Sequence, residues 1–170
     1  MVRLLGLLLL AAGPAWAGFH AAARLARRPR VLRELAAALE EMGREVSFRL
    51  TPLLELFARL ADGREGPVGA LFARCAAGLD GLEACSMGAI WRSAIREAGL
   101  DLDSRSGRAL EELGGALGRC GGADLAAALE QTAEELRAAA ETAARETEQK
   151  GRMDRVLGLT AGAALVILLW

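Results

Sequence analysis

Residues 32–46 have the sequence LRELAAALEEMGREV, in which apolar side chains recur three or four positions apart. The members of this series are Leu32, Leu35, Leu39, Met42 and Val46. Because an α-helix turns once in about 3.6 residues, this spacing places all of them on one face and predicts an amphipathic helix. Pro29 suits the first turn of a helix, so the predicted helix starts near Arg30 and extends for about 20 residues.

The chain beyond this helix alternates between apolar-periodic stretches and short turns rich in Gly, Pro and Asp. Thr51 and Pro52 predict a helix cap and a first-turn proline. Asp103 or Ser104 caps a later helix, and Asp124 caps a long last helix that runs unbroken toward the C-terminus. The predicted inward-facing residues are Leu53, Leu54, Leu56, Phe57 and Leu60; Val68, Leu71, Phe72, Cys75 and Leu79; Ile90, Trp91 and Ile95; Leu110, Leu113 and Leu117; and Leu125, Leu129, Thr132, Leu136, Ala139 and Ala143. The pattern predicts an all-α fold, a six-helix antiparallel bundle.

The composition favours the same fold class. Alanine, leucine, arginine and glutamate dominate the 170 residues, tyrosine is absent and β-branched residues are few, a balance that favours helix over sheet. Once the terminal segments are subtracted, the length allows one domain. The net charge of −1 averages unlike regions, because the first 33 residues carry six arginines and no acid.

Both ends of the chain are apolar. No charge lies between Leu4 and Ala23, and a membrane-spanning helix needs about 20 such residues. At the other end, Val156 to Trp170 is uncharged and comes close to spanning length when extended to Met153. Arginines flank the inner end of both segments, and such flanks favour the cytoplasmic side. The sequence therefore predicts transmembrane helices at 1–23 and 153–170 around a cytoplasmic helical-bundle domain at 24–152.

Two alternatives to this topology and role stay open. Residues 15–17, Ala-Trp-Ala, resemble a signal-peptide cleavage site that follows an apolar run. If that segment is removed, the chain is a secreted, tail-anchored helical protein. The other alternative is a stand-alone membrane-associated helical regulator or chaperone.

Gly158 and Gly162 form a GxxxG pattern in the second apolar segment. Small residues at this spacing let membrane helices approach closely, so the two glycines are candidates for a helix–helix contact in the membrane. Glycine is also frequent in membrane helices in general.

The sequence contains no pattern typical of catalysis or cofactor binding. A P-loop needs a lysine after a glycine-rich loop, and the only lysine, Lys150, has no such loop before it. The only histidine, His20, lies in the first apolar segment, so it is not available to activate a nucleophile in the helical domain. Cys75, Cys85 and Cys120 are widely spaced without a CxxC, which predicts buried, reduced cysteines and neither disulfides nor a metal site. We therefore expect a protein that is not an enzyme and has no cofactor.

Two charged patches are candidates for contacts with partners. Their residues are Arg27, Arg28, Arg30 and Arg33 in the first and Glu130, Glu134 and Glu141 in the second. The arginines suit anionic lipid or an acidic partner surface, and a topology signal explains them equally. The glutamates form an acidic ridge on the last soluble helix that suits a basic partner surface, although exposed charge also keeps a helix soluble. Nucleic acid is not an expected ligand, because the basic run adjoins the membrane and the rest of the domain is mildly acidic.

Several short motifs follow one another in order along the chain. They are Gly18-Phe19, Arg28-Pro29 with Leu32-Arg33, Thr51-Pro52-Leu53, Leu71-Phe72, Trp91, Leu113-Gly114 with Leu117-Gly118, and Leu157-Gly158 with Gly162. Together with the paired apolar ends, their order and spacing resemble the stage III sporulation protein AB family of endospore-forming bacteria, over the whole chain. The chain departs from that family conservatively at Glu45-Val46 and Phe48. It also departs at Cys120 to Asp124, where the family usually has an aspartate-rich stretch that contains Gln.

The resemblance implies a platform or adaptor subunit of a secretion-like channel complex between mother cell and forespore, in the mother-cell membrane around the forespore. The family's soluble domain is similar to the cytoplasmic domain of the inner-membrane platform protein F of type II secretion and type IV pilus systems. In those machines the platform couples a cytoplasmic ATPase to a membrane ring. By analogy, the implied partners are the other subunits of the channel, including its own cytoplasmic ATPase, the AA protein, and an oligomer is compatible with this role.

Overall fold

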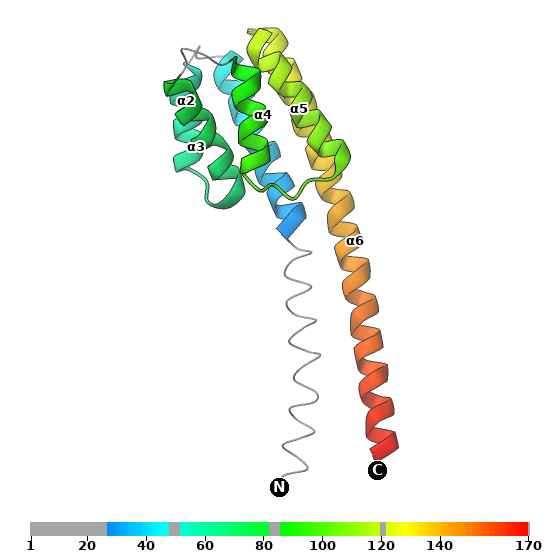
Figure 1. The fold of residues 1–170 in the computed structure, drawn as a ribbon. Coiled ribbons are helices and arrows are strands. Elements are labelled where there is room, and N and C mark those ends of the chain that lie inside the picture. Colours follow the sequence, from blue (N-terminus) through cyan, green and yellow to red (C-terminus); the bar gives the residue numbers. More distant parts are fainter. Residues whose placement is uncertain (1–26, 48–51, 82–85, 120–121, 170) are drawn as a thin grey trace. The chain divides into compact units, whose positions relative to one another are not determined.

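The structure, a computed structural model, describes residues 27–47, 52–81, 86–119 and 122–169, and from residue 150 onward it describes the backbone alone. The described residues lie in helices and the short connections between them (Figure 1). A first helix covers residues 27–47 and is followed by α2 (Leu53–Asp62), α3 (Gly66–Asp80), α4 (Met87–Glu97), α5 (Ser104–Arg119) and α6 (Ala123–Leu169). Six helices and no strand in the described ranges confirm the all-α, six-helix fold.

The chain divides into two compact units. One, here called the helical body, is Pro29–Ala140; the other consists of Met1–Arg28 and Glu141–Trp170. Within the helical body, α2 contacts α3, α3 contacts α4 and α4 contacts α5. Because short turns connect these helices, successive helices run in opposite directions.

The first helix buries its predicted stripe. Leu32, Leu35, Leu39 and Met42 are fully buried, and only Val46 is half-buried. The helix starts earlier than the predicted Arg30, because residues 27–29 are already helical.

Two predicted helix caps differ from the structure by one or two positions. Pro52 itself occupies the cap of α2, where its carbonyl accepts a hydrogen bond from the Leu56 N–H at 3.1 Å; Thr51 lies outside the described residues. Asp124 falls inside the first turn of α6, because Gly122 adopts a φ of 57° and its carbonyl already accepts the Ala126 N–H at 3.1 Å. A left-handed glycine ends the preceding turn at no steric penalty, so the helix starts before the aspartate.

The apolar core gathers around three aromatic rings from three consecutive helices. The ring centroids of Phe57, Phe72 and Trp91 are 6.0 to 6.3 Å apart, within the range in which aromatic pairs attract. The indole N–H of Trp91 donates a hydrogen bond to the Leu110 carbonyl at 2.7 Å and so ties α4 to α5. This bond satisfies the one polar group of a fully buried side chain.

Glycines allow α4 to approach its neighbours closely. A Cβ at Gly114 would lie 2.6 Å from Trp91 Cδ1, and a Cβ at Gly88 would lie 2.9 Å from the Gly114 carbonyl oxygen. A Cβ at Gly78 would likewise lie 2.6 Å from Ile90 Cγ2. The Leu113-Gly114 pair in the sequence therefore has a packing cause, since one residue fills the core and the other makes room for the indole ring.

Some predicted core positions are only partly buried. Leu54 is 42% exposed, and Leu53, Leu79 and Ile95 are half-buried. On α6 the buried line runs through Leu136 to Ala140, with Ala133 also buried, so Ala139 and Ala143 are half-buried. A helix stripe drawn from sequence cannot tell which side of a row of alanines faces the core, because alanine suits both environments.

No helix in the described part of the chain is both long enough and apolar enough to cross a membrane. The predicted membrane segment at 1–23 lies outside the described residues. At the other end, α6 continues without interruption to Leu169, which confirms the prediction of one unbroken last helix.

Candidate docking surface

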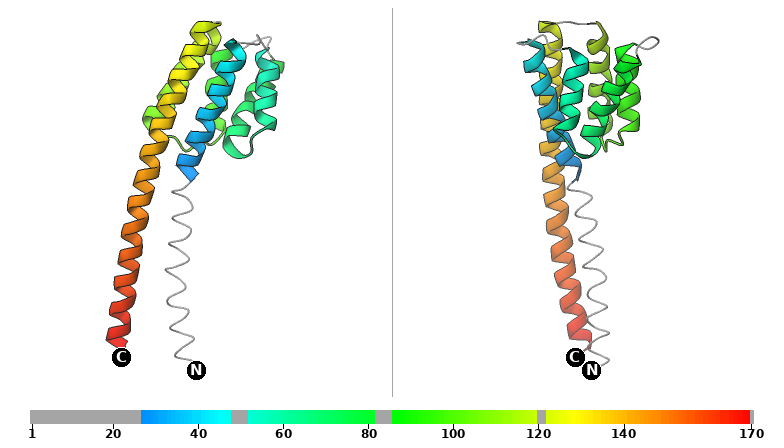
Figure 2. Two further views of the ribbon diagram at one scale, coloured as in Figure 1. Left: turned by 180° about the vertical axis from the view of Figure 1, so that it is seen from behind. Right: turned by 90° about the vertical axis from the view of Figure 1, so that its left-hand side faces the viewer.

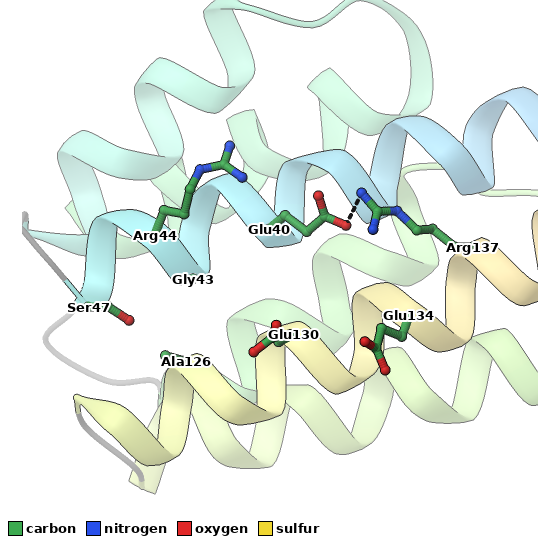
Figure 3. Close-up of a pocket in the computed structure, with 8 residues that line it drawn as sticks. All are labelled: Glu40, Gly43, Arg44, Ser47, Ala126, Glu130, Glu134 and Arg137. Atoms are coloured by element: carbon green, nitrogen blue, oxygen red, sulfur yellow. Dashed lines mark ion pairs between the residues drawn. The ribbon is translucent and has the colours of Figure 1, made fainter.

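A groove of about 360 Å³ lies between the first helix and α6. It is lined by Glu40, Gly43, Arg44 and Ser47 from the first helix and by Ala126, Glu130, Glu134 and Arg137 from α6 (Figure 3). Both views of Figure 2 place these parts of the two helices side by side. A Cβ on Gly43 would lie 3.8 Å from the Ala126 carbonyl oxygen and 3.8 Å from Leu129 Cβ, so small residues line the place where the helices approach.

Ion pairs hold the first helix on both sides. Across the groove, Arg137 of α6 pairs with Glu40 (Figure 3, dashed line). Toward α2, Arg64 pairs with Glu41 at 2.8 Å, and Arg59 pairs with Glu45 at 3.1 Å. These three acids of the first helix are therefore engaged within the helical body.

The acids of α6 in the groove are not engaged in this way. Glu130 and Glu134 are exposed, and neither has a hydrogen-bond or ion-pair partner among the described residues. They stand four residues apart, on successive turns of one face (Figure 3). Like charges at this spacing repel each other by roughly 0.2–0.5 kcal/mol in an isolated helix. A positively charged group placed beside the two carboxylates would reduce this repulsion.

Arg44 is the other charged groove residue without a partner in the described ranges. Its side chain points away from α6 (Figure 3), so it does not neutralise Glu130 or Glu134. The α6 wall of the groove therefore keeps two uncompensated carboxylates.

The third glutamate predicted as a contact residue does not line the groove. Glu141 belongs to the other compact unit, where its side chain is 70% exposed and lies 3.9 Å from Arg145, one turn along α6. The structure thus brings Glu130 and Glu134 into one site and leaves Glu141 out of it.

The predicted arginine patch is mostly exposed. Arg27, Arg30 and Arg33 are exposed on the first helix, whereas Arg28 is half-buried and has an interaction partner. None of the four lines the groove. Their predicted contact with lipid or a partner stays a prediction, as does the contact of Gly158 and Gly162, which lie where only the backbone of α6 is described.

Cys75 is buried and unpaired, as predicted. Burial raises the pKa of its thiol to about 12, so the reactive thiolate is absent at neutral pH. Cys85 and Cys120 lie outside the described residues. Within the described ranges, no cluster of three or more His, Cys, Asp or Glu side chains is placed to hold a metal ion.

Sequence patterns alone did not single out the first-helix wall of the groove or its ion pair. Glu40 and Arg137 are 97 positions apart in sequence, and only the packing of the two helices joins them. The one local signal was Gly43, since glycine inside a helix lowers its stability by about 0.5–1 kcal/mol relative to alanine and so indicates a close approach.

Comparison with known proteins shows which family has this fold and these motifs. No curated protein sequence matches the chain. A solved structure described as "Stage III sporulation protein AB (SpoIIIAB)" is similar, with a TM-score of 0.65 and 25% sequence identity over 70% of this chain and 94% of that chain. The profile of the family described as "Stage III sporulation protein AB" matches residues 3–170. Since this match covers both ends and the helical body, the chain belongs to the stage III sporulation protein AB family, whose role is in sporulation.

Proposed function

We propose that this chain is the membrane-anchored platform subunit of a secretion-like channel complex between mother cell and forespore, and that its helical body docks a cytoplasmic ATPase to the membrane assembly. The family match over residues 3–170 carries the proposal, because it includes the two arginine-flanked apolar ends as well as the helical body. In this proposal the ends anchor the chain in the mother-cell membrane around the forespore and the body faces the cytoplasm.

A docking role also agrees with the chemistry of the helical body. Its groove presents carboxylates and guanidinium groups at the surface, and such groups recognise complementary charge on another protein. The proposal includes that the chain is not an enzyme, since the sequence has no P-loop and its single histidine is His20, outside the body.

Binding of the cognate ATPase, the AA protein of the same complex, tests the proposal directly. The full chain is reconstituted in lipid nanodiscs and titrated with the purified ATPase, with empty nanodiscs as the control. We expect saturable binding to the loaded discs alone. If both proteins are folded and no binding occurs, the docking role is wrong.

Topology is tested separately in cells. Protease added outside intact spheroplasts should leave the helical body undigested, and the intact mass should show that residues 1–17 are still present. Digestion of the body, or loss of residues 1–17, would favour the secreted, tail-anchored alternative.

A further inference from the structure

We propose that copies of this chain associate front to back, with two exposed arginines of α4 in one copy paired with two carboxylates in the groove of the next copy. The arginines are Arg92 and Arg96, here called the basic pair, and the carboxylates are Glu130 and Glu134, here called the acidic pair. This inference goes beyond the proposed function and does not depend on it, because it concerns a contact between copies of the chain.

The basic pair lies on the outer face of α4. Both arginines are exposed, whereas Trp91 and Ala94 of the same helix are buried. No hydrogen bond or ion pair engages either guanidinium group within the described ranges. The neighbouring Glu97 is engaged elsewhere, since its carboxylate accepts hydrogen bonds from Ser93 and Arg74. The outer face of α4 therefore keeps two positive charges available.

The two pairs match in spacing and in charge. Each consists of residues four positions apart in an α-helix, whose Cβ atoms are about 5–6 Å apart. Like charges repel within each pair, and placing the pairs against each other would replace this repulsion by two arginine–carboxylate ion pairs. Arg137 in the α6 wall adds little opposing charge, because Glu40 pairs with it. The small side chains of the groove, Gly43 and Ala126, leave room for long side chains in its volume of about 360 Å³.

Helix direction and height within the helical body also suit this contact. Because α5 runs antiparallel to both α4 and α6, these two helices point the same way (Figure 1). α5 ends at Arg119 and α6 begins at Ala123, and residues equally far from such a turn are about level, which places Leu110 level with Thr132. The hydrogen bond from the Trp91 indole to the Leu110 carbonyl places Trp91 at that height too.

The basic pair and the acidic pair therefore lie at similar heights and in the same order. Thr132 is the midpoint of the acidic pair, and the midpoint of the basic pair, Ala94, comes three residues after Trp91. At 1.5 Å per residue the two midpoints differ in height by about 5 Å, a distance that long arginine side chains cover. Copies that stand side by side in the same orientation bring each arginine to one glutamate.

The two surfaces lie on opposite sides of the helical body. Figure 1 shows α4 in front of the first helix, and the reverse view in Figure 2 shows the first helix and α6 in front. A two-fold dimer joins the same side of each copy, so it cannot satisfy both surfaces. The contact is instead heterologous. Two joined copies still present one basic pair and one acidic pair, and further copies add to form a ring or a chain.

Two other exposed basic pairs of the helical body fit this arrangement less well. Arg33 precedes Glu40, the last groove residue at that end of the first helix, by seven positions, so it lies about 10 Å beyond the groove, and Arg30 lies further away. The other pair, Arg105 and Arg108 of α5, runs in the opposite order to the acidic pair because α5 is antiparallel to α6. The Nε of Arg108 also donates a hydrogen bond to a carbonyl of its own helix at 3.1 Å.

Charge reversal and its rescue in the full chain test the proposal. One variant reverses the acidic pair, a second reverses the basic pair and a third combines the changes: Glu130→Lys/Glu134→Lys, Arg92→Glu/Arg96→Glu and the fourfold variant. Two controls make the same changes of charge at exposed positions elsewhere: Asp62→Lys/Glu65→Lys and Arg105→Glu/Arg108→Glu. Far-UV circular dichroism first establishes that every variant folds like the wild type, which we expect because all these positions are exposed. Sedimentation velocity in detergent, over a range of protein concentrations, then measures the mass of the assemblies.

We expect the wild type to form assemblies larger than a dimer as its concentration rises, and added salt should weaken them. Each single reversal variant should associate more than about tenfold more weakly than the wild type. The fourfold variant, in which the charges are exchanged, should return to within about threefold of the wild type. Mixing the two reversal variants should restore assembly as well. Both controls should stay within about twofold of the wild type.

Several outcomes would overturn the inference. It is wrong if the wild type remains monomeric at every concentration, or if both reversals weaken assembly and the fourfold variant does not recover. Assembly that neither reversal changes would place the contact elsewhere in the chain, and loss of assembly in the Arg105→Glu/Arg108→Glu control alone would assign the contact to that basic pair. Loss of ATPase binding in the acidic-pair variant, with assembly unchanged, would show that a partner protein fills the groove. ATPase binding by the wild type is measured separately, so the proposed function can fail while this inference stands, and the reverse.

Discussion

The contact between α4 and α5 differs in kind from the contact between the first helix and α6. Between α4 and α5, Gly88 and Gly114 allow the backbones to approach, and the buried Trp91 side chain bonds the Leu110 carbonyl. Between the first helix and α6, an exposed groove carries charged side chains, of which Glu130 and Glu134 have no partner among the described residues. The contact between α4 and α5 is closely packed and its buried polar group is hydrogen-bonded, so it stabilises the fold. The surface between the first helix and α6 has carboxylates without a partner among the described residues, and these suit a charged partner.

The largest expected difference comes from truncating the central aromatic residue. Trp91→Ala should lower the free energy of unfolding by about 3–5 kcal/mol, a large share of the 5–15 kcal/mol that is typical of a domain. Urea unfolding of the full chain, followed by far-UV circular dichroism, measures the change. The Glu130→Lys/Glu134→Lys variant is the matched comparison and should unfold at the wild-type midpoint. Equal losses in both variants would mean that the two contacts do not differ in kind.

Two glycines of the same helix give the next largest contrast. Gly114→Ala should destabilise by about 1–3 kcal/mol, because its new Cβ would lie 2.6 Å from Trp91 Cδ1. Gly107→Ala should instead stabilise by up to about 1 kcal/mol, since no heavy atom lies within 4 Å of a Cβ at that position. The same unfolding experiment checks both, and a gain of stability in the Gly114 variant would show that α4 and α5 are not in close contact.

The buried Cys75 thiol in the core should also be protected from reagents in solution. Burial raises the pKa of the Cys75 thiol from 9.0 to about 12, so a disulfide reagent should label it in denaturant and not in the native state. Because the folded pKa is above the unfolded pKa, the thiol is protonated in both states below pH 9.0, and the free energy of unfolding falls as pH rises from 9.0 toward 12, where only the unfolded state loses the proton. Unfolding measured from pH 8 upward should therefore depend less on pH in Cys75→Ala. Rapid native labelling at Cys75 would be inconsistent with a sealed core.

The smallest effect concerns an exposed ion pair outside the groove. The Ser93 hydroxyl, which donates a hydrogen bond at 2.9 Å, and the Arg74 guanidinium group, at 3.2 Å, lower the pKa of Glu97. The stability that these hydrogen bonds to the ionised Glu97 carboxylate contribute is present above the unfolded pKa of Glu97. It is lost as pH falls through the folded pKa. An NMR titration should give Glu97 a midpoint below the ordinary value of a glutamate, and Ser93→Ala should shift that midpoint upward. A Glu97 midpoint that does not change in the Ser93→Ala variant would contradict this interpretation.

The helices and most of the core followed from the sequence. Leu and Phe at spacings of three and four identified the buried faces of the first helix, α3 and α5, because a helix face of large apolar residues has no other stable location. Alanine-rich α6 was less well determined, and the buried face includes Ala133 and Ala140 and not Ala139 and Ala143. The predicted starts of α2 and α6 were also displaced, because the carbonyls of Pro52 and Gly122 already accept the first intrahelical hydrogen bonds.

The candidate site was only half predictable. Glu130 and Glu134 were predicted as contact residues together with Glu141, which does not line the groove, and the opposite wall comes from Glu40, Gly43 and Arg44, which are distant in sequence. Which carboxylates remain available depends on where Arg137, Arg64 and Arg59 reach. Those distances are set by tertiary packing, and local periodicity contains no information about them.

Hydrogen exchange of the full chain, at concentrations at which it is monomeric and at which it is associated, tests the assignment of the docking surface most directly. We expect association to slow exchange in α4 and in residues 40–47 and 126–137, which form the two walls of the groove, and to leave α2 and α3 unchanged. Slowed exchange in α2 and α3 with none along the groove would contradict the assignment.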